Sequence, residues 1–139
     1  MREIREQLLE IFASDEPEYA RAAAVGPAAV PVLRRMLDED DLDVAASAVC
    51  VAGMIATHEV LDILASAAHS SETDLRFYSA SALGDFVKRS RSADDLEVVS
   101  EILAPLLDDP DPDVRRFAQR AAAAFPGSAH HSVARGPSS

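Results

Sequence analysis

Residues 26–53 read GPAAVPVLRRMLDEDDLDVAASAVCVAG, and the second half of this stretch comes back twice along the chain. The three copies read LDVAASAVCVAG, TDLRFYSASALG and PDVRRFAQRAAA, at residues 42–53, 73–84 and 112–123. In each copy, small residues stand five and ten positions after the aspartate. Self-similarity at intervals of roughly 30 to 40 residues is typical of helical-repeat proteins, in which stacked helix pairs bury one continuous core. The pattern therefore predicts an all-α solenoid of antiparallel helix hairpins.

Apolar residues recur at helical spacing on both sides of each acidic turn, and Gly, Pro or polar linkers separate the segments. The spacing predicts one domain over residues 1–126, with about three repeats at 26–56, 57–91 and 92–126. Residues 1–25 match the repeat poorly and are expected to be a degenerate N-terminal capping helix pair, because terminal units are usually atypical. Residues 127–139 have almost no large apolar side chain, which predicts a disordered tail.

The recurring polar and small positions have expected structural roles. The aspartate that opens each copy is a good N-cap, which predicts caps at Asp43, Asp74 and Asp113. Gly53 and Gly84 occupy the same later position in the first two copies. Because glycine inside a helix costs about 0.5–1 kcal/mol relative to alanine, we expect both glycines to make room for the next repeat.

The stretches GPAAVPVLRRMLDEDDLDV and LAPLLDDPDPDVRRFAQRAA resemble the unit of the HEAT-repeat family. In that unit a first helix is followed by a short acidic turn, and the second helix then begins with Asp-Val-Arg. The resemblance covers about residues 26–126. It implies a right-handed superhelix whose second helices line a concave, ligand-binding face, and it implies non-catalytic binding as the usual activity. The chain departs from the family at Ala45, which replaces the arginine, and Ala123 replaces the glycine in the last copy.

The charge balance narrows the class of partner. There are 24 acidic and 13 basic residues, for a formal net charge of −11. Such a charge disfavours nucleic acid and anionic membranes and favours a basic protein partner. The single cysteine excludes an internal disulfide and fits a reducing compartment. With neither a signal peptide nor an apolar run of about 20 residues, a cytoplasmic protein is expected, bacterial in style from its Ala and Arg bias.

No motif in the sequence points to catalysis, a cofactor or a metal. The acidic runs at 38–43 and 108–113 lack the glycine turn and closing glutamate of a calcium loop, so they are interpreted as turns. Cys50 has no histidine placed beside it as a base, and no Gly-rich phosphate loop is present. We therefore expect no enzymatic activity, no cofactor and no metal ligands.

The second helices offer the candidate binding surface. Positions three and seven residues after each aspartate should point away from the core, and these are Ala46, Cys50, Phe77, Ser81, Arg116 and Arg120. An accessible aromatic residue flanked by arginine is the composition of an interface hot spot, which singles out Phe77. The alternative interpretation is that Phe77 turns into the core between repeats and that Arg116 pairs with a local aspartate.

Three functions are compatible with this pattern. The first is an adaptor or scaffold whose concave face holds another protein. The second is an acidic immunity-type inhibitor that neutralises a basic toxin, and the third is a protein like the HEAT-repeat lyases that attach bilins. At the open end of the array, Phe117, Ala121 and Ala124 are expected to leave apolar surface bare, to be covered by the tail, a partner or a second subunit in a homodimer.

Overall fold

The structure, a computed structural model, describes residues 3–14 and 18–126, and every regular element in these ranges is a helix. The predicted disordered tail at 127–139 lies outside the described residues. The helices in chain order are α1 (Ile4–Phe12), α2 (Tyr19–Ala23), the 3-10 helix η1 (Gly26–Ala29), α3 (Val30–Leu37), α4 (Leu42–Ile55), the 3-10 helix η2 (His58–Val60), α5 (Leu61–Ala68), α6 (Thr73–Arg89), α7 (Ala93–Leu107) and α8 (Pro112–Ala123). The all-α prediction is confirmed for these residues.

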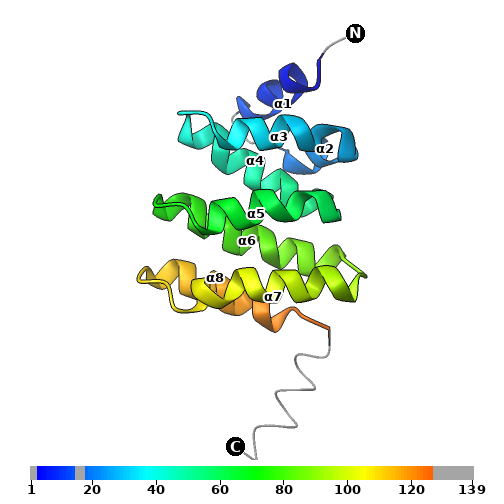
Figure 1. The fold of residues 1–139 in the computed structure, drawn as a ribbon. Helices are drawn as coiled ribbons and strands as arrows, with labels where there is room; N and C mark the ends of the chain where they lie inside the picture. Colours follow the sequence, from blue (N-terminus) through cyan, green and yellow to red (C-terminus); the bar gives the residue numbers. More distant parts are fainter. Residues whose placement is uncertain (1–2, 15–17, 127–139) are drawn as a thin grey trace, which may run out of the picture.

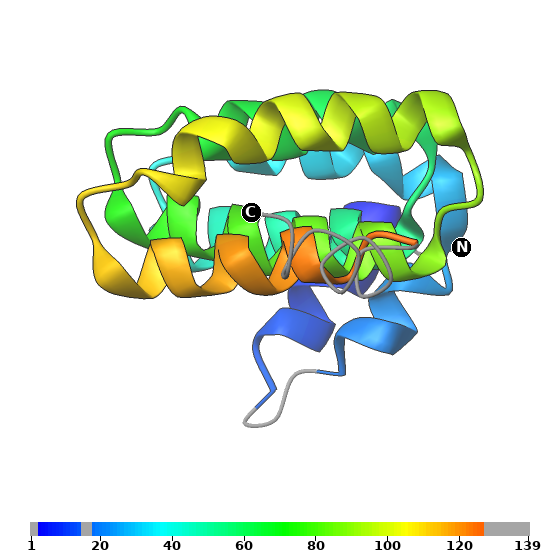
Figure 2. The ribbon, with the colours of Figure 1, turned by 90° about the horizontal axis from the view of Figure 1, so that it is seen from below.

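The helices from α3 onwards form two layers. Figure 1 shows the pairs α3–α4, α5–α6 and α7–α8 stacked one below another. The view along the stack shows α3, α5 and α7 in one layer and α4, α6 and α8 in the other (Figure 2). In the second layer α6 packs between α4 and α8, and each of these helices also packs against the helix that precedes it. The three sequence copies therefore lie side by side on neighbouring helices.

The first two helices leave this arrangement. The α1–α2 pair is turned out of the two layers and projects beyond the layer of α4, α6 and α8 (Figure 2). It is held to the rest by the buried side chains of Leu8 and Ala22 and by an ion pair between Arg5 and Glu39. Helix α2 packs on α4, so the pair forms a wall at one end of the second layer.

The core is aliphatic and rich in alanine, as the composition requires. Its largest fully buried side chains include Leu33, Leu64, Leu83 and Phe86. Ser79, the small residue of the second copy, is also fully buried, and its hydroxyl donates a 2.8 Å hydrogen bond to the carbonyl oxygen of Leu64 on α5. A small polar residue at this position therefore ties α6 to its partner helix without leaving an unsatisfied group.

The predicted N-caps at Asp43, Asp74 and Asp113 are wrong. The capping carboxylate of α4 is Asp41, whose Oδ1 accepts hydrogen bonds from the N–H groups of Asp43 and Val44 at 3.0 and 3.2 Å. Asp111 caps α8 in the same way, at 2.9 and 3.1 Å, and α6 has no side-chain cap. At α8 the reason is Pro112, which occupies the first helical position, where a missing N–H costs nothing, so the capping residue is Asp111.

The two repeated glycines differ in their surroundings. A β-carbon on Gly53 would lie 2.5 Å from the carbonyl oxygen of Ala82 on α6, which no side chain tolerates. At Gly84 the nearest atoms belong to Ala121 and would be 3.7 Å away, an ordinary contact. The prediction of a close approach therefore holds at Gly53 and is wrong at Gly84, because α4 and α6 approach each other more closely than α6 and α8 at this position.

A largely buried ion pair joins the first turn of α6 to the turn before α8. The guanidinium of Arg76 donates to both carboxylate oxygens of Asp109, at 2.7 and 3.3 Å, and to the carbonyl oxygens of Ser70 and Ser71. Asp109 is only 5% exposed, and its carboxylate also accepts the N–H of Asp111 at 2.9 Å. Much of the acidic run at 108–113 is thus committed to internal hydrogen bonds.

A hydrogen bond between His58 of η2 and Asp95 of α7 can be tested through the pKa of His58. Its Nδ1 lies 2.8 Å from Oδ1 of Asp95, and this hydrogen bond, helped by the charge of Asp95, raises the pKa of the imidazole. We expect Asp95→Asn to return the pKa of His58 towards its ordinary value of about 6.5, as followed by NMR titration of the ring. Because the pKa of His58 is raised in the folded protein, its hydrogen bond with Asp95 contributes fully to stability below the pKa of His58 in the unfolded chain. That contribution is lost as pH rises through the pKa of His58 in the folded protein. A His58 pKa that is the same in both proteins would contradict this contact.

Candidate functional site

The six candidate residues lie on the three helices of the second layer. Ala46 and Cys50 belong to α4, Phe77 and Ser81 to α6, and Arg116 and Arg120 to α8. The two arginines are exposed, while Cys50, Phe77 and Ser81 are half-buried. Ala46 differs from the expectation of an outward-pointing residue, because it is buried at 9% exposure.

Phe77 connects α6 to α8 through ring contacts. Its ring centroid lies 4.5 Å from that of Phe117 on α8 and 5.3 Å from that of Tyr78, which it meets edge-on at 82°. Arg120 places its guanidinium carbon 4.8 Å from the centroid of Phe117, a cation–π contact. Arg116 pairs with Asp113 at 3.2 Å, as the alternative interpretation anticipated, but Phe77 stays half-buried rather than fully enclosed.

A separate aromatic contact lies in the N-terminal pair. Phe12 and Tyr19 meet edge-on with centroids 6.0 Å apart, and both line one cavity together with Tyr78. We call Phe12, Tyr19, Tyr78, Phe77 and Phe117 the aromatic row. The chain has five Phe, two Tyr and no Trp, and the row holds five of those seven aromatic side chains, all half-buried.

Sequence reasoning found only part of this row. The sequence pattern predicts a surface role for Phe77 but indicates none for Phe12 or Tyr19. One signal was present, because Tyr78 and Phe117 occupy the same position of their copies, directly after the position of Phe77. The structure explains the pattern: Phe77 of one helix meets Phe117 of the next, one position later in its copy.

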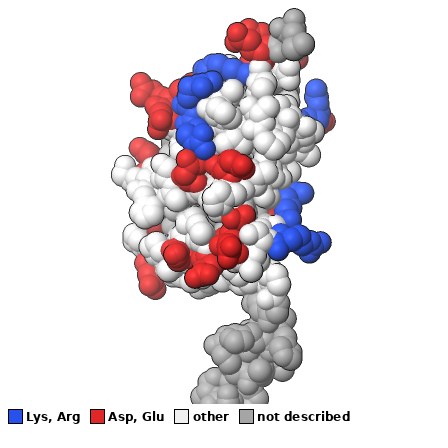
Figure 3. Space-filling model, turned by 45° about the vertical axis from the view of Figure 1, so that its right-hand side comes forward, with Lys and Arg blue, Asp and Glu red and all other residues white. Residues whose placement is uncertain are grey.

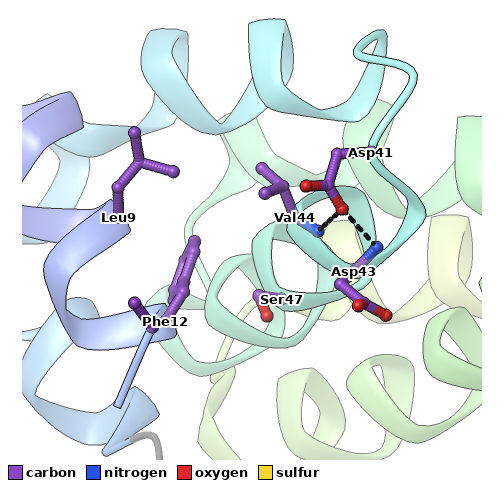
Figure 4. A pocket seen from close by; sticks show the side chains of 7 residues that line it. Leu9, Phe12, Asp41, Asp43, Val44 and Ser47 are labelled. Carbon is purple, nitrogen blue, oxygen red and sulfur yellow. Dashed lines mark hydrogen bonds between the residues drawn. The ribbon is translucent and has the colours of Figure 1, made fainter.

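Two adjoining cavities lie where the N-terminal pair overhangs α4. The first, of about 340 Å³, is shown in Figure 4, where Leu9 and Phe12 point from α1 towards Val44 and Ser47 of α4. The second, of about 260 Å³, is the Tyr78 cavity, lined by Phe12, Tyr19, Leu42, Asp43, Ala46, Ser47, Asp74 and Tyr78. Phe12, Asp43 and Ser47 border both, and the hydroxyl of Ser47 lies 3.2 Å from that of Tyr19.

The charges on this surface change sign along the row. Asp43 and Asp74 border the Tyr78 cavity, whereas Arg116 and Arg120 lie on α8. Burial raises the pKa of the Tyr78 phenol, and nearby negative groups, Asp74 and Asp43 among them, raise it further. On the face seen in Figure 3, acidic and basic groups both occur: some adjoin each other and others are separated by uncharged surface.

At the expected bare apolar end of the stack, Ala121 is enclosed, whereas Phe117 and Ala124 remain half-buried. Ala121 is fully buried and faces Gly84 of α6, and Phe117 packs on Phe77. Both side chains therefore face back into the stack, and Ala124 is half-buried. Six residues after the aspartate of each copy, the first two copies have the buried residues Val49 and Ala80, whereas α8 has the exposed Gln119.

The thiol of Cys50 has the wrong electrostatics for a nucleophile. Burial, followed by the negative charge of Asp85, raises its pKa to about 11, so the thiol is protonated at neutral pH. A reactive cysteine needs the opposite, a lowered pKa in an electropositive setting. Its half-buried position on α4 is that of a packing residue.

Within residues 3–14 and 18–126, no group of three or more His, Cys, Asp or Glu side chains is arranged to hold a metal ion. In the same part of the chain no helix combines the length and apolarity needed to cross a membrane. The chain matches no protein-family model and none of the curated proteins with which it was compared.

Proposed function

We propose that this chain is a non-catalytic protein-binding module that holds a segment of another protein along the aromatic row. In this proposal residues 26–126 form a right-handed α-solenoid of three HEAT-like repeats, and residues 1–25 cap it. Support comes from the recurrence of one sequence pattern on α4, α6 and α8, helices that pack side by side. The row would then lie on the concave face.

The aromatic row itself carries the proposal. Half-buried aromatic rings on packed helices offer large contact area while losing little side-chain entropy on binding, and aromatic residues and arginine are enriched in interface hot spots. The rings of Phe77 and Phe117 are already fixed by each other, and Arg120 covers part of Phe117. Such a pre-ordered surface suits binding better than catalysis, because it presents contact area without an activated nucleophile or base.

The shape of the surface favours an elongated ligand. The row runs from the N-terminal pair across α6 to α8, and the overhanging α1–α2 pair closes one end. A helix or extended peptide with apolar anchors could follow this path, with its basic end towards Asp43 and Asp74 and its acidic end towards Arg116 and Arg120. The proposed partner is thus a protein segment with apolar anchors.

Replacing Phe77 and Phe117 tests the proposal. Peptides are first selected from a displayed random library against the intact chain, and their affinities are then measured for the double variant Phe77→Ala, Phe117→Ala by calorimetry. Truncation of hot-spot side chains costs about 2 kcal/mol or more, so affinity should fall by at least about 30-fold. Circular dichroism checks that the variant keeps its helix content.

The matched control is Val98→Ala, since Val98 is an exposed large apolar side chain on α7, in the other layer. It should leave the affinities unchanged. Selected peptides that bind the double variant as tightly as the wild type, or that respond to the Val98 variant instead, would rule out the aromatic row as the binding surface.

The net charge of −11 favours a second candidate, an acidic inhibitor of a basic protein. The two candidates differ in kinetics, because association steered by opposite charges slows steeply as salt is added. The association rates of the selected peptides at low and high salt separate the two candidates by degree: a ligand held mainly by apolar anchors should lose little of its rate, whereas a charge-steered ligand should lose it steeply.

A further inference from the structure

We propose that the Tyr78 cavity binds the guanidinium group of an arginine side chain on the bound protein segment. This inference rests on the proposed function, because it names the anchor at one end of the aromatic row. The ligand class is thus a delocalised cation at the end of an aliphatic chain.

The walls of the cavity supply three aromatic rings from different parts of the chain. Phe12 comes from α1, Tyr19 from α2 and Tyr78 from α6. The face of an aromatic ring carries partial negative charge and attracts a cation placed over it, and arginine is the cation that most often does so in proteins. The same chain already shows this contact at Arg120 over Phe117.

The charged groups at the cavity leave it net negative. Asp43 and Asp74 stand in the first turns of α4 and α6. Each helix N-terminus contributes about +0.5 of an elementary charge, so two carboxylates leave roughly one negative charge at the cavity. Both residues are exposed, and neither carboxylate forms a salt bridge with another described residue.

Arginine fits this site better than lysine. Its planar guanidinium can lie on a ring while its N–H groups donate to carboxylates at the edge, a geometry that a compact ammonium lacks. The hydroxyls of Tyr19 and Ser47, 3.2 Å apart on the same wall, provide further acceptors. Tyr78 borders the cavity and touches Phe77, so the aliphatic stem of the arginine would lead directly onto the row.

The chain contains its own reporter for this site. It has no Trp, and its two tyrosines, Tyr19 and Tyr78, both line the cavity. We would titrate the intact chain with Nα-acetyl-arginine amide and with the citrulline analogue, which has nearly the same shape but no charge. Tyrosine fluorescence and NMR signals of the tyrosine rings are the readouts.

The arginine compound should shift the signals of both tyrosine rings in a saturable way, and the citrulline compound should not do so at equal concentration. The double variant Asp43→Asn, Asp74→Asn should weaken binding by about tenfold or more, as expected for loss of two charge-assisted contacts. The control is Asp113→Asn, which changes the equivalent position of the third copy on α8, away from the cavity, and should leave binding unchanged.

Equal binding of the citrulline compound, or no binding of the arginine compound, would overturn the inference. Either result would leave the Phe77 and Phe117 measurements standing, since those residues lie further along the row and outside the cavity. Conversely, the arginine compound could bind saturably while the affinities of the selected peptides are unaffected by the Phe77 and Phe117 substitutions. That result would rule out the proposed function and support the cavity as an arginine site. The two failures are thus distinguishable.

Discussion

Replacing Asp109 with alanine is expected to lower the free energy of unfolding by about 3 kcal/mol, the typical cost of removing one member of a buried ion pair. Asp109 is 5% exposed and the Arg76 side chain 17%, so the substitution leaves a partly buried guanidinium without its carboxylate. It also removes the acceptor of the Asp111 N–H at the turn before α8. Chemical denaturation followed by circular dichroism measures the loss.

The chain provides a matched pair for comparison. Arg34 and Asp62 have nearly the same two-pronged geometry, at 2.8 and 3.1 Å, but their side chains are 42% and 61% exposed. Exposed pairs contribute about 0–1 kcal/mol, so Asp62→Ala should cost less than 1 kcal/mol. Similar losses for the two variants would show that burial does not set the strength of the Arg76–Asp109 pair.

The same pair predicts a pH dependence. Burial alone raises the pKa of Asp109, but the hydrogen bonds from Arg76 and from the Asp111 N–H outweigh it and hold the pKa below its ordinary value. The ionised Asp109 carboxylate therefore contributes fully to stability above its pKa in the unfolded chain, about 3.9. This contribution is lost as pH falls through the pKa of Asp109 in the folded protein. In Asp109→Ala the stability should fall less steeply with acid than in the wild type.

The second large effect is expected at Gly53. In Gly53→Ala the new methyl group would lie 2.5 Å from the carbonyl oxygen of Ala82 and 2.8 Å from its Cα. Backbone atoms cannot rotate away as a flexible side chain can, so α4 and α6 must separate. Overpacking of this kind costs about 1–3 kcal/mol, more than the roughly 0.5–1 kcal/mol that alanine gains in a helix. The melting temperature should fall by several degrees.

Gly84→Ala is the control, because it makes the same change at the same position of the next copy. The added methyl group would meet Ala121 at 3.7 Å, an ordinary contact, so the gain in helix propensity should dominate. We expect unchanged or slightly raised stability. Equal destabilisation by both substitutions would mean that glycine is needed for some reason other than the distance between helices.

Local pattern was enough to place the helices. The three sequence copies at 42–53, 73–84 and 112–123 lie in helices Leu42–Ile55, Thr73–Arg89 and Pro112–Ala123. Apolar periodicity and Gly or Pro stops act within a few residues of each other, so they can be read along the chain. At α4 and α8 the capping aspartate lies two positions before the predicted one, because each helix begins earlier than an N-cap at Asp43 or Asp113 would require.

The sequence by itself therefore determined the all-helical class, the helix positions and the repetition of one pattern, since these depend on neighbours within one or two turns. Only the tertiary structure decided which aromatic side chains meet and which glycine lies against backbone. Phe12 and Tyr19 share a cavity with Tyr78 because the α1–α2 pair turns out of the two layers and α2 packs against α4. The distance between two helices depends on the side chains of both, so no single stretch of sequence contains it.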